Sequence, residues 1–386
     1  MLKLFNSFSS SKEDFIPFEK NLAKIFICGP TVYDYTHLGH ARIFLIYDLL
    51  SRCLNDQGLQ TDVLVNMTDI NQNVFNKAKE NFTTYKDVAT FYASAFEKDL
   101  EVLNIHSITR LAFVSDYVQN IEKDVITLIQ KQVAYMAHGN VYLDISKVKN
   151  YGKISHQTKE QLSLHRLDIG PGKKNPEDVM LWNCTDDFDF SWKSELGEGI
   201  PWWHMQDTAV AMDNFGKNYD IHGGARELLY PHHEAHLAQY QLLSDSDVPV
   251  KAWVHVGLVL SDGEKMSKSI GNVVWVKDLI KKYDQNLIRL YIFSKHYRDD
   301  MDFSEKDLLA KKPLLDLIKF AKSNVSNKTH EDVSNLIQIF IQSLHNDLDS
   351  SKALESLEKI CIEIRNGKGI SQIDFNRICE ILGIKV

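Results

Sequence analysis

The sequence predicts an α/β protein: a doubly wound parallel sheet that is interrupted by an inserted domain and followed by a helical bundle. The first observation is a strand–helix–strand order near the N-terminus. The second is a change of texture between residues 136 and 195, where short strand-like runs alternate with glycine, proline and lysine. The third is a pattern of leucine and isoleucine at three- and four-residue steps from about residue 304 to the end, which is typical of helices.

The first strand is predicted within residues 24–33, where a short apolar run from Ile25 to Ile27 ends in Cys-Gly-Pro. An apolar run with a chain breaker at its carboxyl end is typical of a buried parallel strand. Residues 37–54 follow as a helix and residues 61–70 as a second strand. Since a strand, a helix and a strand in close succession form a βαβ unit, the two strands are predicted to be parallel.

The remaining elements follow in order. We predict helices up to about residue 135, short strands in "GNVYLDISKV", "YGKISH" and "DVMLWNC", and further parallel strands at residues 218–224 and 252–260. The predicted parts of the chain are a first half of the sheet domain at 1–135, an insertion at 136–200, a second half at 201–260, a loop region at 261–310 and a helical bundle at 311–386.

The composition excludes several classes of protein. Of the 386 residues, 44% are hydrophobic and 25% are charged, and the net charge is −8, so no strongly basic face for nucleic acid is expected in bulk, although a local basic groove stays possible. The chain contains no run of about 18 apolar residues, so we expect no membrane span. The start "MLKLFNSFSSSKEDF" has no long apolar core and is not expected to be a signal peptide. Five scattered cysteines argue against a disulfide framework and favour a reducing cytoplasm.

Four stretches rich in polar residues and glycine follow the predicted parallel strands. They are "CGPTVYDYTHLGH", "NMTD", "DIHGG" with the "PHHEAH" that comes after it, and "LSDGEKMSKS". In a doubly wound sheet, ligands bind beyond the carboxyl ends of the strands, at the point where the strand order reverses. We therefore expect the four stretches to form one site.

Two of these stretches carry groups that suit a polyanion. In "THLGH", His37 and His40 flank Gly39 at a predicted helix start, where free N–H groups and the helix dipole favour a phosphate. In "KMSKS", Lys265 and Lys268 lie in a polar loop and could both reach such a ligand. Each motif by itself is equally compatible with a solvated helix start or an exposed basic loop.

Together and in this order, the two motifs resemble the paired signature of class I aminoacyl-tRNA synthetases. Longer strings narrow the resemblance to cysteinyl-tRNA synthetases and to the related mycothiol-pathway ligase, which joins cysteine to an amino sugar with the same core; they include "FICGPTVYDYTHLGHAR", "KKNPEDVMLW", "WVHVG" and "DGEKMSKSIGN". The resemblance extends from about residue 20 to about residue 360. It implies the class I synthetase Rossmann-like fold with a connective insertion, and a Lys-Met-Ser-Lys-Ser loop with a stem-contact region at 261–310.

The resemblance also implies an ATP-dependent ligase. In that chemistry an amino-acid carboxylate attacks the α-phosphate of ATP, pyrophosphate leaves, and an acceptor takes the acyl group, so the protein mainly positions groups and stabilises charge. The implied catalytic residues, which act on the triphosphate and the leaving pyrophosphate together with Mg²⁺, are His37, His40, Lys265 and Lys268. The implied ATP-binding residues are Gly29, Pro30, Gly39, His222, Gly223, Gly224 and Glu227.

A zinc site is implied as well. Cysteinyl-tRNA synthetases use zinc to hold the substrate thiolate, with two cysteines, a histidine and a glutamate as ligands. The resemblance carries these positions onto Cys28, Asp207, His232 and His236, so two of the four have changed identity, yet every one is a residue type that binds zinc. We therefore expect a retained metal; the alternative is a metal-free site with His236 solvated and Asp207 hydrogen-bonded. His233 is expected to point elsewhere.

The implied amino-acid-binding residues are Cys28, Thr68 and Trp203, which favour a small side chain. A metal with one sulfur ligand in place of two is harder and more electrophilic, so the expected substrate is cysteine or another small amino acid. The sequence also departs from the family beside the implied ribose contact. Glu227 stands where the family usually has an aspartate, and Ala225 replaces a third glycine.

Two acceptors are compatible with the sequence. It stops about where cysteinyl-tRNA synthetases begin an anticodon-reading domain, as mycothiol-type ligases do, and residues 311–386 carry almost equal numbers of basic and acidic side chains. We therefore favour a small amine or another non-translational acceptor, with tRNA charging without an anticodon domain as the alternative. An alternative of another class is a catalytically silent regulatory protein that binds nucleotide or tRNA. We expect a cytoplasmic monomer.

Overall fold

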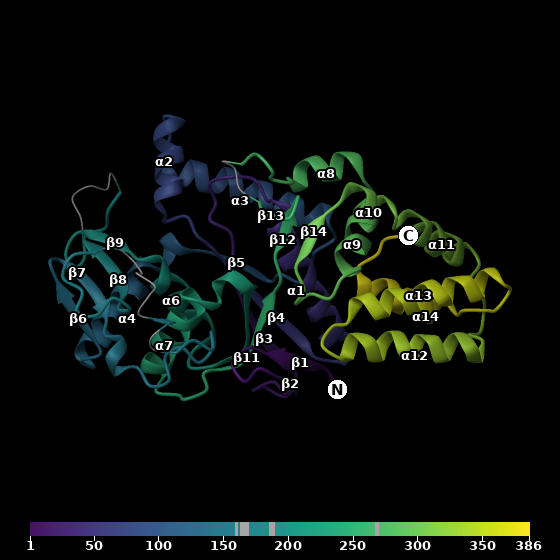
Figure 1. Ribbon diagram of the computed structural model, residues 1–386, viewed down its shortest axis with the longest axis horizontal. Helices are drawn as coiled ribbons and strands as arrows, with labels where there is room; N and C mark the ends of the chain where they lie inside the picture. The colour runs from purple at the N-terminus through teal and green to yellow at the C-terminus, as the bar shows by residue number, and fades with distance from the viewer. Residues whose placement is uncertain (159–160, 163–169, 185–189, 267–269) are drawn as a thin grey trace.

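The computed structural model describes residues 1–158, 161–162, 170–184, 190–266 and 270–386. Its centre is a five-stranded parallel sheet of order β11–β10–β3–β4–β5 (Figure 1). The strands are β3 (Leu22–Ile27), β4 (Gln60–Met67), β5 (Arg110–Phe113), β10 (Tyr219–Ala225) and β11 (Val250–Val256). The predicted α/β class with a parallel sheet is confirmed. Since β4 and β5 extend the sheet on one side of β3 while β10 and β11 extend it on the other, the switch point lies between β3 and β10.

Helices cover both faces of this sheet: α1 (Leu38–Asp56) and α3 (Tyr85–Val102) belong to the core on one face, and α6 (Trp203–Phe215) and α7 (His232–Ser244) to the core on the other. Two further helices, α2 (Gln72–Glu80) and α4 (Val118–Gln130), pack against α3 and α6 respectively. Successive side chains of a strand point to opposite faces. Ile25 and Ile27 of β3 accordingly pack in the core that contains α1, whereas Phe26 packs in a separate core with residues of α6 and α7.

The insertion forms an antiparallel sheet at the left of Figure 1. Its strands are β6 (Ala134–Ala137), β7 (Asn140–Leu143), β8 (Val179–Cys184) and β9 (Gly199–Pro201). The strands predicted in "GNVYLDISKV" and "DVMLWNC" are present, but "YGKISH" forms turns. The reason is that the backbone N–H groups of Lys153, Ile154 and Ser155 donate to the carboxylate of Glu234 at 2.9–3.1 Å, not to a neighbouring strand.

The segment predicted as a single strand at residues 252–260 is divided at Gly257. Its N–H donates to Tyr297 O at 2.8 Å, and a Cβ there would lie 2.4 Å from Asp299 O, so a crossing segment ends β11. The chain then enters a small sheet and two short helices, namely β12 (Val259–Ser261), β13 (Glu264–Lys265), β14 (Met301–Phe303), α8 (Val276–Lys282) and α9 (Gln285–Phe293). A hairpin of β1 (Lys3–Asn6) and β2 (Ser11–Asp14) precedes the main sheet.

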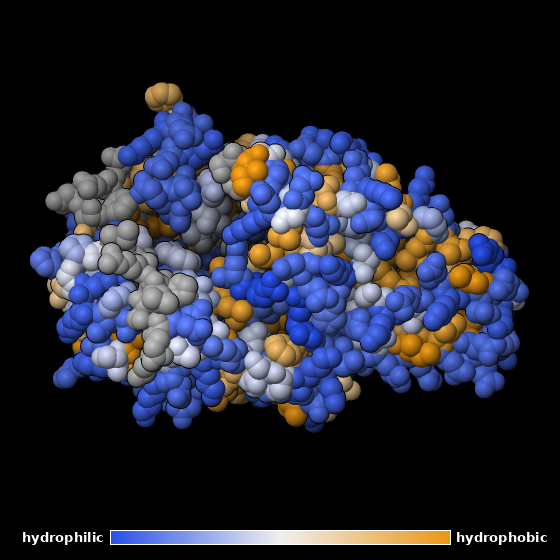
Figure 2. All heavy atoms as spheres, viewed as in Figure 1, coloured by the Kyte–Doolittle hydropathy of each residue, from blue (hydrophilic) through white to orange (hydrophobic). Residues whose placement is uncertain are grey.

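The C-terminal region is helical, in agreement with the sequence pattern. Its helices are α10 (Glu305–Leu309), α11 (Lys312–Ser323), α12 (Glu331–His345), α13 (Ser350–Arg365) and α14 (Gln372–Leu382). They lie at the right of Figure 1, and Figure 2 shows apolar side chains among hydrophilic ones on this end of the molecule. Within the described ranges, no helix is both long enough and apolar enough to span a bilayer.

A buried arginine fastens this region to the sheet domain. The guanidinium of Arg289, on α9, donates to Asp48 Oδ2 of α1 at 2.7 Å, to Leu382 O of α14 at 2.8 Å and to Leu103 O at 2.8 Å. Arg289 and Asp48 are both fully buried. Since a buried charge that loses its partner is costly, the pair fixes the position of α14 against α1.

Replacement of this arginine tests that role. We expect Arg289→Met to lower the free energy of unfolding by about 3 kcal/mol, because it leaves the Asp48 carboxylate and two buried carbonyls short of donors. Arg377→Met is the matched control, since Arg377 pairs with Asp56 near the surface and such pairs contribute about 0–1 kcal/mol. Urea unfolding measures both variants, and equal losses would contradict the assignment.

Candidate active site

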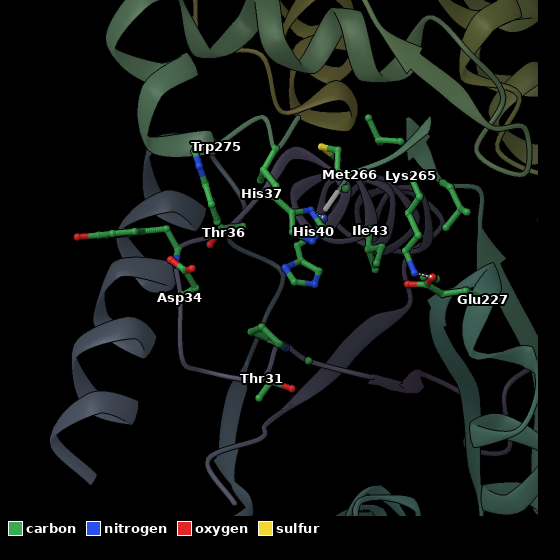
Figure 3. Close-up of a pocket in the computed structure, with 18 of the residues that line it drawn as sticks. Thr31, Asp34, Thr36, His37, His40, Ile43, Glu227, Lys265, Met266 and Trp275 are labelled. Atoms are coloured by element: carbon green, nitrogen blue, oxygen red, sulfur yellow. Dashed lines mark hydrogen bonds and ion pairs between the residues drawn. The ribbon is translucent and has the colours of Figure 1, made fainter. Parts of the chain in front are cut away.

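A cavity of about 1040 Å³ opens beyond the carboxyl end of β3, at the switch point of the sheet. Its walls come from the turn after β3, the start of α1, the 3₁₀ helix η3 (Arg226–Leu229) and the loop after β12 (Figure 3). The predicted site residues that line it are Cys28, Gly29, Pro30, His37, Gly39, His40, Glu227 and Lys265. The cavity thus brings together residues of the "THLGH" and "KMSKS" motifs, which are far apart in the sequence.

The two histidines of "THLGH" form one unit at the start of α1. His37 is the N-cap residue: its Nδ1 accepts a hydrogen bond from His40 N at 3.2 Å. The two rings are stacked with centroids 3.8 Å apart. Because Nδ1 of His37 is an acceptor, Nε2 of the neutral ring carries the proton and is a donor. A Cβ at Gly39 would lie 2.9 Å from the His37 ring, so a larger residue there would displace that ring from its present position.

Backbone donors at the start of α1 are already partly engaged. Leu38 N donates to Val274 O at 2.8 Å, and His40 N donates to the His37 ring. A helix N-terminus attracts phosphate through such free N–H groups and through its dipole. With two of these groups bound within the chain, the imidazoles and the nearby lysine supply a larger share of the attraction.

Lys265 lines the cavity beside Glu227 (Figure 3). Its ammonium forms an ion pair with the carboxylate of Glu227, as the dashed line in Figure 3 shows. Both side chains are well exposed. Two residues predicted to act on ATP therefore contact each other in this structure. Lys268, the second predicted lysine, lies outside the described residues.

Three of the predicted ATP-binding residues lie beneath the cavity and not on its wall. His222 is fully buried, stacks on Phe26 and receives or donates a hydrogen bond between its Nδ1 and Tyr219 OH at 2.6 Å. At Gly223 a Cβ would lie 1.6 Å from Tyr47 OH of α1, so glycine is needed there for helix packing. Gly224 is backed by Leu228 and the ring of His233 in the same way.

A cluster of potential metal ligands adjoins the cavity at Cys28. The Cys28 Sγ atom lies 3.0 Å from Asp207 Oδ2 and 3.1 Å from His233 Nε2. His232 Nε2 lies 2.9 Å from the same oxygen of Asp207. Ligand atoms of Cys28, His232 and His233 are all within 4.8 Å of one another, and all three residues are buried. One cysteine thus belongs both to the cavity wall and to the cluster.

His236, the fourth predicted metal ligand, has hydrogen-bond partners at both ring nitrogens. Its Nε2 is 2.8 Å from Tyr219 OH and its Nδ1 is 3.1 Å from Thr208 Oγ1, so both ring nitrogens have partners away from Cys28. His233, expected to point elsewhere, faces the thiol in its place. Helix α7 begins at His232 and is buried through Tyr240, so the four-residue spacing does not reveal which face meets the cysteine.

Burial sets the charge state of the cluster. Desolvation, reinforced by the charge of Asp207, raises the pKa of the Cys28 thiol well above its ordinary value. Desolvation also disfavours the ionised carboxyl of Asp207, but His232 and the hydrogen bonds from His232 and Cys28 hold its pKa below the ordinary value. Desolvation and neighbouring histidines lower the pKa of His233 well below its ordinary value. The cluster therefore combines a thiol, a carboxylate and a neutral imidazole.

These donors fit a zinc ion. Zinc prefers sulfur, imidazole nitrogen and carboxylate oxygen in a tetrahedral set, in which neighbouring ligand atoms are about 3.3–3.6 Å apart. Three of the ligand separations, Cys28 to Asp207, Cys28 to His233 and His232 to Asp207, are 2.9–3.1 Å and would widen by a few tenths of an ångström. The ligand atoms of Cys28, His232 and His233 lie within 4.8 Å of one another. Trp203 stacks on His232 with ring centroids 4.6 Å apart, and so fixes the plane of that ring.

The remaining predicted amino-acid contact, Thr68, follows β4. It pairs with Thr31 in a parallel bridge, and its hydroxyl accepts from Asn66 Nδ2 at 3.3 Å. That asparagine also contacts Gly29 and Asp207 and was not among the predicted site residues. Its place in "NMTD" at a strand end is the sequence feature that points to it.

Comparison with known proteins places this geometry in a family. Residues 14–312 match the family described as tRNA synthetases class I (C) catalytic domain. The chain is 33% identical over 384 residues to a cysteine–tRNA ligase of Methanococcus maripaludis, which covers 95% of this chain and 80% of that protein. It is 34% identical over 376 residues to a cysteine–tRNA ligase of Thermoplasma volcanium, with coverage of 96% and 83%. These names do not support the expected preference for a non-translational acceptor.

Solved structures share the fold at lower identity. The methionyl-tRNA synthetase of Mycobacterium tuberculosis in complex with methionyl-adenylate has a TM-score of 0.70 at 12% identity, and covers 94% of this chain and 88% of that one. The leucyl enzyme of Agrobacterium radiobacter K84 has a TM-score of 0.65 at 10% identity, with 96% and 84% covered. The match to the family over most of the chain decides the assignment: the chain belongs to the class I aminoacyl-tRNA synthetases, is cysteinyl-tRNA synthetase-like, and is an ATP-dependent ligase.

Proposed function

We propose that the protein is a cysteine–tRNA ligase, which forms cysteinyl-adenylate from cysteine and ATP with Mg²⁺ and then transfers the cysteinyl group to tRNA. The observation that carries this proposal is the double position of Cys28, which lines the cavity and lies within 3.1 Å of both Asp207 and His233. A group able to hold a thiolate thereby adjoins a site for a triphosphate. The names of the relatives support tRNA as the acceptor.

In this proposal the cavity residues act on the phosphates. His37 donates from Nε2, and Lys265 leaves Glu227 to neutralise the charge that develops on pyrophosphate. Positioned donors and cations in a site that excludes water are the usual main source of such stabilisation. Lys268 takes the same role by its place in the Lys-Met-Ser-Lys-Ser motif. Glu227, once released, is available to the ribose hydroxyls.

Zinc is proposed to be held by Cys28, Asp207, His232 and His233. When bound, it would supply a Lewis acid that takes the substrate thiolate in preference to a hydroxyl, because soft sulfur binds zinc more strongly than neutral oxygen does. The protein residues fix where that side chain lies. Trp203 stacks on His232 and Thr68 bonds to Asn66, so both proposed contacts of the amino acid lie beside the ligands.

An exchange assay with a panel of amino acids tests the activation step. We expect cysteine to drive ATP–pyrophosphate exchange at least about 100-fold faster than serine, in kcat/KM, because a site built for a thiolate leaves a hydroxyl poorly bound. Charging of total tRNA with labelled cysteine tests the acceptor. No exchange with any amino acid would contradict the activation step, whereas exchange without charging would contradict only tRNA as acceptor.

Replacement of the loop lysine tests its part in catalysis. We expect Lys265→Ala to lower the exchange rate by about 100-fold, the usual effect of removing one group that stabilises transition-state charge. Lys281→Ala is the matched control, since Lys281 is an exposed lysine of α8 whose partner is Asp278. Unchanged exchange in Lys265→Ala would remove this lysine from the proposed mechanism.

The choice of metal ligands is tested by two alanine variants on the same helix. His233→Ala is expected to weaken zinc binding by about 100-fold or more, because the loss of a ligand costs at least as much as the loss of a residue that orients a ligand. His236→Ala is expected to weaken zinc binding by less than about tenfold. Competition with a chromophoric chelator measures both affinities. The opposite ranking would restore His236 as the ligand.

A further inference from the structure

One buried amide joins the two chain segments that carry the proposed acidic and sulfur ligands. Asn66 is 2% exposed and is the last residue but one of β4. Its Oδ1 accepts from Gly29 N at 2.6 Å, and its Nδ2 donates to Asp207 Oδ1 at 2.7 Å. The Asn66 side chain therefore bridges the peptide next to Cys28 and the carboxylate on α6.

This bridge decides which way the carboxylate faces. With Oδ1 of Asp207 engaged by Asn66, Oδ2 is the oxygen that lies 3.0 Å from Cys28 Sγ and 2.9 Å from His232 Nε2. A carboxylate without such a donor rotates about its last torsion, since that torsion has a broad energy profile. The donor removes this freedom and leaves a single oxygen directed at the cluster.

The amide itself cannot turn over without loss. Its oxygen faces a backbone N–H and its nitrogen faces a carboxylate, so the reversed orientation would set nitrogen against N–H and oxygen against oxygen. Nδ2 also lies 3.3 Å from Thr68 Oγ1, a proposed contact of the amino acid. One fixed side chain thus orients a metal ligand and a substrate contact together.

We propose that Asn66 is a positioning residue of the metal site, which sets Asp207 as a one-oxygen ligand at a fixed distance from Cys28. The proposal rests on the proposed zinc site. Partners that orient the ligands of a metal are typically responsible for about 10- to 100-fold in metal affinity. Asn66 also bonds to Thr68, so the same side chain would position both a metal ligand and a contact of the amino acid.

The test uses an isosteric change. Asn66→Asp keeps an acceptor for Gly29 N but replaces the donor to Asp207 by a second carboxylate oxygen. We expect zinc affinity, measured by chelator competition, to fall by about 10- to 100-fold and the visible absorption bands of the Co²⁺-substituted protein to shift. The matched control is Asn214→Asp, the same change on α6, where Asn214 bonds Tyr117 and Val210 away from the cluster.

Asn66→Ala is the second variant, since it removes the donor without adding a charge; circular dichroism and the melting temperature show that each variant folds. If the wild type binds zinc and the folded Asn66→Asp and Asn66→Ala variants show the same affinity and the same Co²⁺ spectrum as the wild type, the positioning role alone is overturned. Failure of the wild type to bind zinc would overturn the proposed metal site and this role with it. Loss of affinity in both Asn66 variants, but not in Asn214→Asp, supports the role.

Discussion

The close approach of the turn after β3 to the end of β4 governs the geometry of the whole site. At Gly29 a Cβ would lie 1.7 Å from Asn66 O, so only glycine allows the two segments to meet. That contact brings the Asn66 amide within reach of Gly29 N and Asp207 at once. The same turn places Cys28 under the cavity, where its N–H donates to Gly223 O of β10 at 2.9 Å. The ends of β4, β3 and β10 are thereby joined at one edge, and the cavity and the cluster both open from it.

The altered ligand set has a consequence for charge. Burial and the charge of Asp207 raise the pKa of the Cys28 thiol, while the pKa of Asp207 lies below its ordinary value because its contacts with His232 outweigh desolvation. A divalent metal at the proposed site would be held by the thiolate form of Cys28, so its binding would release the thiol proton. In the proposed site, zinc with one thiolate, one carboxylate and two neutral imidazoles would form a neutral centre, whereas two thiolates, a carboxylate and one imidazole would give a net negative one. A neutral centre would attract an anionic thiolate of a substrate more strongly, which is compatible with cysteine as the amino acid even though one sulfur ligand has been lost.

The sequence predicts the strands on either side of the switch point because β3 and β4 contain buried apolar runs, and β10, which has polar residues in its middle, ends in a pair of glycines followed by alanine. It does not reveal β5, which lies in a segment predicted as helical, since Arg110–Phe113 is a short edge strand with only Ala112 buried. The same limit applies at the site. His37, His40, Gly39 and Lys265 follow from their motifs, but the ligand choice between His233 and His236 depends on where α7 begins and on Tyr219 and Thr208, which engage His236. Packing of Tyr47 against Gly223, likewise, is a tertiary contact that no local pattern contains.

The ion pair between Lys265 and Glu227 has to be reconciled with a cavity that takes a triphosphate. Both side chains are more than a third exposed, and pairs of this kind contribute only about 0–1 kcal/mol in water. A triphosphate with Mg²⁺ offers Lys265 more negative charge than one carboxylate does, so exchange of partners is favourable once ATP arrives. The buried contacts of the cluster have no such freedom, because Asp207, His232 and His233 are enclosed by protein. In the proposed function, the site therefore joins a buried half that would select the amino acid to an exposed half that would rearrange around the nucleotide, with Cys28 common to both.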